Sequence, residues 1–178
     1  MKPEIMYRHA QIADNLRRLP RKMLQLHGHN HVTDFVLHEL CSKECFNIPK
    51  AAYFIDNPAF NCLKGVVGVS GEELNSSESD IWTNPESFIQ KMADSSFNQH
   101  VRSFVYDSHK KRGEPAQEMA EVIARELGLN DYNFYSWDMK HDNHGFLVCE
   151  KNNTPDCEHP QEDVIVDGLC LLSFCPIY

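Results

Sequence analysis

The sequence predicts a single α+β domain, and two observations carry that expectation. Apolar residues at helical spacing dominate the first two thirds of the chain, whereas short strand-like runs gather in the last third. The length of 178 residues fits one domain, because domains most often hold about 100–150 residues. We therefore expect residues 1–178 to form one globular domain whose sheet is completed by C-terminal strands.

Four helices follow from the spacing of apolar residues and from start and stop signals. The first is expected to end at Pro20, because proline interrupts a helix interior. The last is expected to end at Gly128, since glycine is typical of the residue just past a helix. The expected helices cover residues 4–19, a span from Thr33 or Asp34 to before Pro49, 84–105 and 115–127.

The expected strands are short apolar runs bounded by turn residues. A polar, acidic stretch over 70–83 is expected to be an exposed loop. The segment Leu169–Ile177 is too apolar to lie in water, and its near-continuous apolar run predicts a core strand covered on both faces. The expected strands cover residues 51–56, 66–69, 132–137, 145–149, 164–166 and 169–174.

The charge balance excludes one class of partner. Lysine and arginine number 17 against 26 acidic residues, which gives a net charge of −9 with histidine neutral. Nucleic-acid binding draws most of its affinity from neutralised phosphates, so we expect no nucleic acid as a partner.

The longest uncharged run, residues 168–178, is well short of the roughly 20 residues that cross a bilayer, so we expect no membrane association.

The cysteine pattern predicts a reducing compartment. The seven cysteines are odd in number, form no Cys-x-x-Cys pair and follow no export signal. Disulfides are rare in the cytosol, so we expect a cytoplasmic protein whose seven thiols are all unbridged. A homo-oligomer is left open, and the sequence does not indicate a substrate.

Three histidines within five residues are the least ordinary feature of the chain. His27, His29 and His31 would lie on one side of an extended segment, because side chains alternate along a strand. Gly28 allows the tight backbone path that neighbouring ligands often need. Neutral imidazole nitrogen suits Zn, Fe, Ni or Cu, so this segment indicates a transition-metal site.

The helix that follows adds further side chains of the metal-binding type. At 100° per residue, His31, Asp34, His38, Cys41 and Cys45 share roughly a quarter-turn beside an apolar stripe. The alternative is that Cys41 and Cys45 are core thiols and that His38 is a partly buried histidine. The predicted metal ligands are His27, His29, His31, His38 and Cys41, with Zn or Fe as the expected cofactor.

Two function classes follow. If the metal is catalytic, the expected class is metal-assisted hydrolysis, because a bound ion lowers the pKa of its water toward about 7. Asp34 and Asp142 are the acidic candidates for a general base. The alternative is a non-enzymatic interaction or structural protein without a specific metal site, since no phosphate-loop, zincin or nucleophile-elbow motif is present.

A second polar group comprises His141, Asp142 and His144, with Cys157 and His159 further on. Loops at strand ends are common places for chemistry, so this group could join the first one. The alternative, which turn preferences favour, is a polar turn built on Asp142 and the asparagine that follows it.

The segment Leu26–Val32 resembles the Gly-His-x-His segment of calcineurin-like metallophosphoesterases, and His141–Gly145 loosely resembles their Gly-Asn-His segment. Those enzymes place Asp-x-His first and Gly-His-x-His last. Here the histidine-rich segment precedes every other candidate ligand group, and no matching Asp-x-His lies near the N-terminus. Membership of that family is therefore excluded, and no residue roles are carried over.

Overall fold

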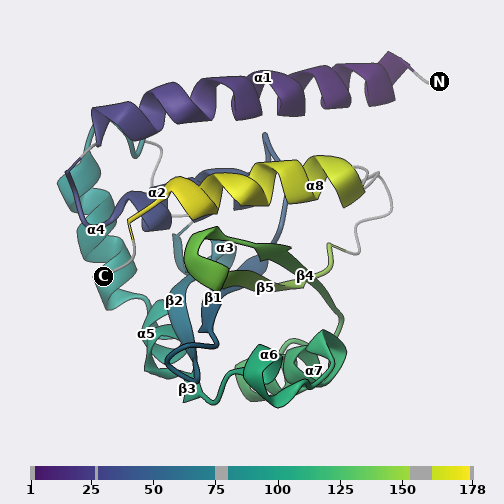
Figure 1. Cartoon of the computed structure of the whole chain (residues 1–178). Helices are drawn as coiled ribbons and strands as arrows, with labels where there is room; N and C mark the ends of the chain where they lie inside the picture. The colour runs from purple at the N-terminus through teal and green to yellow at the C-terminus, as the bar shows by residue number, and fades with distance from the viewer. Residues whose placement is uncertain (1–2, 27, 75–79, 153–161, 177–178) are drawn as a thin grey trace.

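The computed structural model describes residues 3–26, 28–74, 80–152 and 162–176. Within these ranges, one five-stranded antiparallel sheet lies between two layers of helices (Figure 1). The strand order is β3-β2-β1-β5-β4. The predicted α+β class is confirmed.

The sheet is built around strand β1, whose residues 51–56 are all buried. It pairs with β2 on one side and with β5 on the other. The strands predicted at 51–56, 66–69, 132–137 and 145–149 are confirmed. The strands are β1 Lys50–Asn57, β2 Cys62–Ser70, β3 Val105–Tyr106, β4 Tyr132–Asp138 and β5 His144–Glu150.

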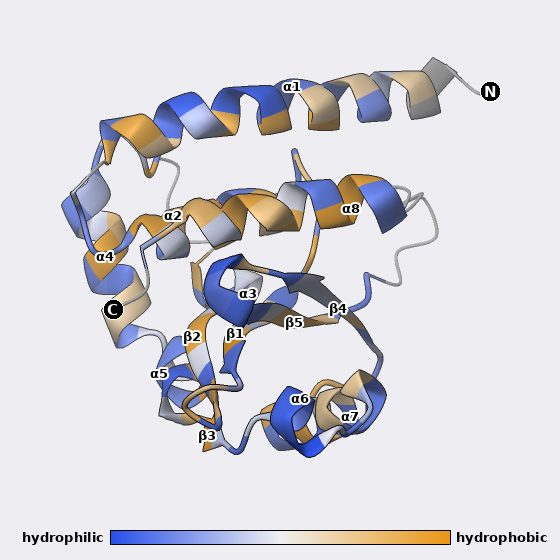
Figure 2. Cartoon of the chain, viewed as in Figure 1, coloured by the Kyte–Doolittle hydropathy of each residue, from blue (hydrophilic) through white to orange (hydrophobic). Residues whose placement is uncertain are grey.

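The first helical layer packs on the face of the sheet that carries Tyr53, Ile55 and Leu147. Helix α2 lies deepest, with residues 32–37 buried. Figure 2 shows hydrophobic and hydrophilic residues alternating along α1, whereas eight of the ten residues of α2 are buried. The elements that contribute to this core are α1 Pro3–Gln25, α2 Val32–Cys41, α3 Gly71–Leu74, α4 Pro85–Asp94, α8 Glu162–Leu169 and the 3-10 helix η2 Cys170–Phe174.

The second layer covers the opposite face, around Phe54 and Phe146 of the sheet. It contains the predicted helix that ends at Gly128, a residue in the left-handed conformation with φ of 68°. The helices of this layer are α5 Ser96–Ser103, α6 His109–Arg112 and α7 Ala116–Leu127, and the 3-10 helix η1 Lys140–Asp142 lies in the turn between β4 and β5.

Helix α5 lies directly on the backbone of β2. The buried Asn98 side chain accepts a hydrogen bond from the Gly68 N–H at 2.9 Å and donates one to the Met92 carbonyl at 2.7 Å. At Gly65, an added Cβ atom would lie 1.9 Å from the Val101 carbonyl oxygen. Only glycine therefore permits this approach of helix to strand.

The C-terminal strand prediction is wrong, because residues 164–166 and 169–174 are helical, in α8 and η2. Ile165, Leu169 and Leu172 are buried at spacings of four and three residues, which is a helical pattern hidden in the apolar run. The predicted burial is confirmed for Leu169 and Leu172, whereas Phe174 is 72% exposed and Ile177 lies outside the described residues.

The predicted stop at Pro20 is also wrong, because α1 continues to Gln25. Proline removes one backbone hydrogen bond from a helix interior. Leu19 and Leu26 are buried on either side of it, and packing of this kind provides most of the stability of helices in proteins.

The helix predicted over 84–105 is divided at Ser95 into α4 and α5. The Ser95 hydroxyl accepts a hydrogen bond from the Asn98 N–H at 3.0 Å and so caps α5. The loop predicted over 70–83 is corrected too: it contains α3, and its residues Ile81 and Trp82 are buried.

Candidate functional site

Helix α2 lines a pocket at each of its two ends. The first, of about 600 Å³, lies at its N-terminal end and is called the Asp34 pocket. Its volume is in the usual range for small-molecule sites. The residues that line it are Asn30, His31, Thr33, Asp34, Ile55, Asn57, Phe60, Cys62, Lys64, Gly65, Val66, Arg102, Asn143 and Pro176.

Asp34 is the electrostatic centre of this pocket. Its carboxylate is only 2% exposed and accepts hydrogen bonds from Arg102 Nη2, at 2.8 Å to Oδ1 and 3.0 Å to Oδ2. His31 Nδ1 lies 3.1 Å from Asp34 Oδ2. The buried carboxylate is thus held by one guanidinium and one imidazole, which come from α5 and from the residue before α2.

The structure corrects the predicted cap of this helix. Helix α2 begins at Val32, with His31 at the N-cap position and no side-chain cap hydrogen bond. Thr33 and Asp34 were the expected caps, but both lie inside the first turn. Asp34 accepts a hydrogen bond from Arg102, which lies 68 residues further along the chain, and no local sequence pattern predicts this contact.

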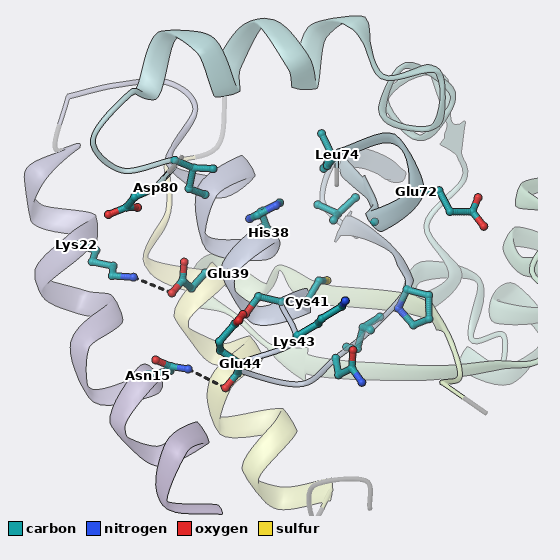
Figure 3. Close-up of a pocket in the computed structure, with 17 residues that line it drawn as sticks. Asn15, Lys22, His38, Glu39, Cys41, Lys43, Glu44, Glu72, Leu74 and Asp80 are labelled. Carbon is teal, nitrogen blue, oxygen red and sulfur yellow. Dashed lines mark hydrogen bonds and ion pairs between the residues drawn. The ribbon is translucent and has the colours of Figure 1, made fainter. Parts of the chain in front are cut away.

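The second pocket, of about 760 Å³, lies at the C-terminal end of α2 and is called the Glu39 pocket (Figure 3). Glu39 Oε1 accepts from Lys22 Nζ at 2.7 Å, and its Oε2 accepts from the Trp82 indole at 2.9 Å. The charged or titratable residues that line it are Lys22, His38, Glu39, Cys41, Lys43, Glu44, Glu72 and Asp80.

Two predicted metal ligands lie at the Glu39 pocket. The His38 ring contacts the Phe88 ring edge-on, with centroids 5.0 Å apart, and burial lowers the pKa of His38. Cys41 is 7% exposed, and burial raises the pKa of its thiol well above the usual value. A neutral, buried thiol of this kind is a weak ligand, because metals bind the thiolate.

The remaining predicted ligands lie elsewhere. His27 is outside the described residues, and His29 is exposed. Gly28 has φ of 92°, so the segment turns here and is not extended as predicted. His31 belongs to the Asp34 pocket, seven residues and therefore about 10 Å of helix rise from His38.

The four predicted ligands that lie within the described residues are accordingly divided between two pockets and the surface. Within the described ranges, no group of three or more His, Cys, Asp or Glu side chains is arranged to hold a metal ion. The Zn or Fe site, and the metal-dependent hydrolysis that would depend on it, stay predictions.

Elemental analysis tests the metal prediction. Untagged protein, dialysed against a weak chelator near neutral pH, is expected to retain close to one equivalent of Zn or Fe if the prediction holds. A His29→Ala/His31→Ala double variant is the matched comparison. Equal, background metal in both proteins would contradict the prediction.

The cysteines of the described residues are all free. These six are Cys41, Cys45, Cys62, Cys149, Cys170 and Cys175, which agrees with the predicted reduced state for that part of the chain. Cys157 and His159 lie outside the described residues.

The second polar group forms a turn, as the turn preferences indicated. His141 and Asp142 both adopt left-handed backbone conformations, with φ of 60° and 55°. Both side chains are exposed, whereas Asn143 next to them lines the Asp34 pocket. The His31 segment and this turn therefore both border the Asp34 pocket, the turn through Asn143.

A buried acid–histidine pair under α6 was not indicated by any sequence pattern. Asp56, at the end of β1, is 0% exposed, and His109, at the start of α6, is 1% exposed. His109 Nε2 lies 3.2 Å from Asp56 Oδ2 without hydrogen-bonding geometry, and the Lys110 backbone N–H donates to the same oxygen at 3.2 Å. The His109 ring also packs on Phe146, with centroids 5.4 Å apart.

Comparison with known protein families, curated proteins and solved structures found no match for this chain. Across the described residues, no helix is long and apolar enough to cross a membrane.

Proposed function

We propose that this chain binds a small anionic ligand, one that carries a carboxylate or phosphate group, in the Asp34 pocket. The observation that carries the proposal is the charge of the pocket lining. Arg102 and Lys64 are two cations against the single carboxylate of Asp34. The chain as a whole carries −9, so this concave surface has the opposite sign to the molecule around it.

The arrangement of Arg102 supports this function. Across the described part of the chain, its hydrogen bonds to Asp34 use Nη2 alone, which leaves the donors on Nε and Nη1 for a ligand. The Asp34 contact fixes the guanidinium in place before any ligand arrives. A fixed, planar donor suits the two oxygens of a carboxylate or phosphate.

Neutral polar groups complete the lining. Asn30, Asn57 and Asn143 contribute amide side chains, and Phe60 and Val66 contribute apolar surface. A few placed polar groups among apolar ones are typical of small-molecule sites. His31 contacts Asp34 through Nδ1, so its Nε2 is the ring nitrogen that could donate a hydrogen bond to an anionic ligand.

A charge reversal at Lys64 tests the proposal. Lys64 is exposed at the pocket rim, so Lys64→Glu should preserve the fold while it removes the attraction for anions. We expect inorganic phosphate and succinate, titrated by calorimetry at an ionic strength of about 0.1 M, to bind the variant about tenfold more weakly, equivalent to about 1.4 kcal/mol.

Lys43→Glu is the matched control. Lys43 is also exposed, lines the Glu39 pocket and gives the same change in net charge. Its substitution should change the affinities for phosphate and for succinate by less than about twofold. At about 0.1 M salt, the electrostatic effect of an exposed charge is largely screened beyond about 10 Å. Equal weakening by both variants, or no binding of either probe by the unmodified chain, would refute an anion site here.

A further inference from the structure

Helix α1 carries two separate stripes. One stripe faces the body of the protein, with Ile12 and Leu19 buried in the core. The other faces solvent, and its members recur at alternating spacings of four and three residues, the repeat of a coiled-coil seam. The exposed members of this outer stripe are Met6, Ala10, Ala13, Arg17, Pro20 and Leu24.

The outer stripe leads into an apolar groove at the C-terminal end of α1. This groove, of about 700 Å³, lies between α1 and η2, and Met23, Leu24, Leu171 and Phe174 are among its lining residues. Of the six large hydrophobic side chains that are exposed in the described ranges, four belong to the outer stripe, its flank or the groove. They are Met6 at 58%, Tyr7 at 74%, Leu24 at 71% and Phe174 at 72% exposed.

From these features we infer that two copies of this chain pair through α1, with the two helices antiparallel. The stripe is self-complementary in size about its midpoint. A two-fold axis there sets each alanine opposite a larger side chain of the second copy, Ala10 opposite Pro20 and Ala13 opposite Arg17. At the ends of the stripe it sets Met6 opposite Leu24. It also directs Met6 and Tyr7 of each copy toward the groove of the other.

Charge selects the antiparallel orientation. The exposed basic residues Arg17, Arg18 and Arg21 all lie in the C-terminal half of α1. Parallel helices would set these three against their own copies, whereas antiparallel helices set Arg17 opposite Ala13 and move Arg18 and Arg21 away from their own copies. Asp14, which pairs with Arg17 and Arg18 of its own helix, would then lie beside Arg17 of the second copy as well.

A pair of opposite charges at the two ends of the stripe tests both the dimer and its orientation. In analytical ultracentrifugation, the unmodified chain is expected to sediment as a dimer, with twice the chain mass of 20.5 kDa. Met6→Glu and Leu24→Lys should each weaken the dimer at least about tenfold, because each sets a charge against an apolar side chain. The double variant should regain the dimer, since Glu at position 6 then faces Lys at position 24 of the other copy.

Val105→Glu is the control, because Val105 is 63% exposed on β3 and lies outside the stripe and the groove. It should sediment as the unmodified chain does, and circular dichroism should show the same fold for all variants. A monomeric unmodified chain, single variants that stay dimeric, or dissociation by Val105→Glu would overturn the α1 interface. A double variant that stays dissociated would overturn the antiparallel arrangement.

Discussion

Replacing His109 by leucine is expected to lower the free energy of unfolding by about 1–3 kcal/mol, the usual cost of leaving a buried polar group without its partner. The Asp56 carboxylate beneath it is fully buried, and its Oδ1 has no partner among the described residues. Without the imidazole, the carboxylate would keep only the Lys110 backbone N–H on its other oxygen. Chemical denaturation monitored by circular dichroism measures the loss.

The double variant Asp56→Leu/His109→Leu separates charge burial from lost packing. It removes the carboxylate together with the imidazole, so we expect it to be more stable than His109→Leu alone. If the single variant loses less than about 1 kcal/mol, Asp56 is not held by His109 and the pair has no role in anchoring α6.

Gly65→Ala is expected to lower the free energy of unfolding by about 1–3 kcal/mol, the usual cost of overpacking. The added methyl group would lie 1.9 Å from the Val101 carbonyl oxygen and 2.8 Å from its carbonyl carbon. These are backbone atoms, so no side-chain rotation relieves the clash and α5 as a whole has to move. Thermal and chemical denaturation of the variant give the size of the effect.

The neighbouring residue provides the control for this prediction. Lys64 precedes Gly65 in β2 and is exposed, so Lys64→Ala should change stability by less than about 0.5 kcal/mol. Equal stability of Gly65→Ala and Lys64→Ala would show that α5 does not need its close contact with β2.

The fold was predictable where local signals are strong. Asn84 precedes α4 and Pro85 begins it, Gly128 follows α7, and turn residues bound β1, so these elements begin or end close to the expected positions. The C-terminal segment was not predictable in this way. A run in which almost every residue is apolar has no polar positions that would distinguish a helical period from a strand period. Ile165, Leu169 and Leu172 are identified as one buried helical face only by their packing in the core on the sheet.

The candidate site was predictable only in part. Angular position around α2 correctly brought His31 near Asp34, but it ignores the rise along the axis, which separates His31 from His38 and Cys41. Arg102 joins Asp34 from α5, a contact that depends on tertiary folding alone. Lys110 and Lys111 are exposed, whereas the adjacent His109 is buried, and this difference depends on tertiary packing.

The two tryptophans of the chain both belong to the core beneath α2 and η2. Trp82 donates to Glu39 at 2.9 Å, and Trp137 donates to the Ser173 hydroxyl at 2.8 Å and stacks on Tyr53. Tryptophan fluorescence therefore reports on one side of the sheet and not on the side covered by α5, α6 and α7. Unfolding followed by fluorescence and by circular dichroism would coincide only if both sides of the sheet come apart together.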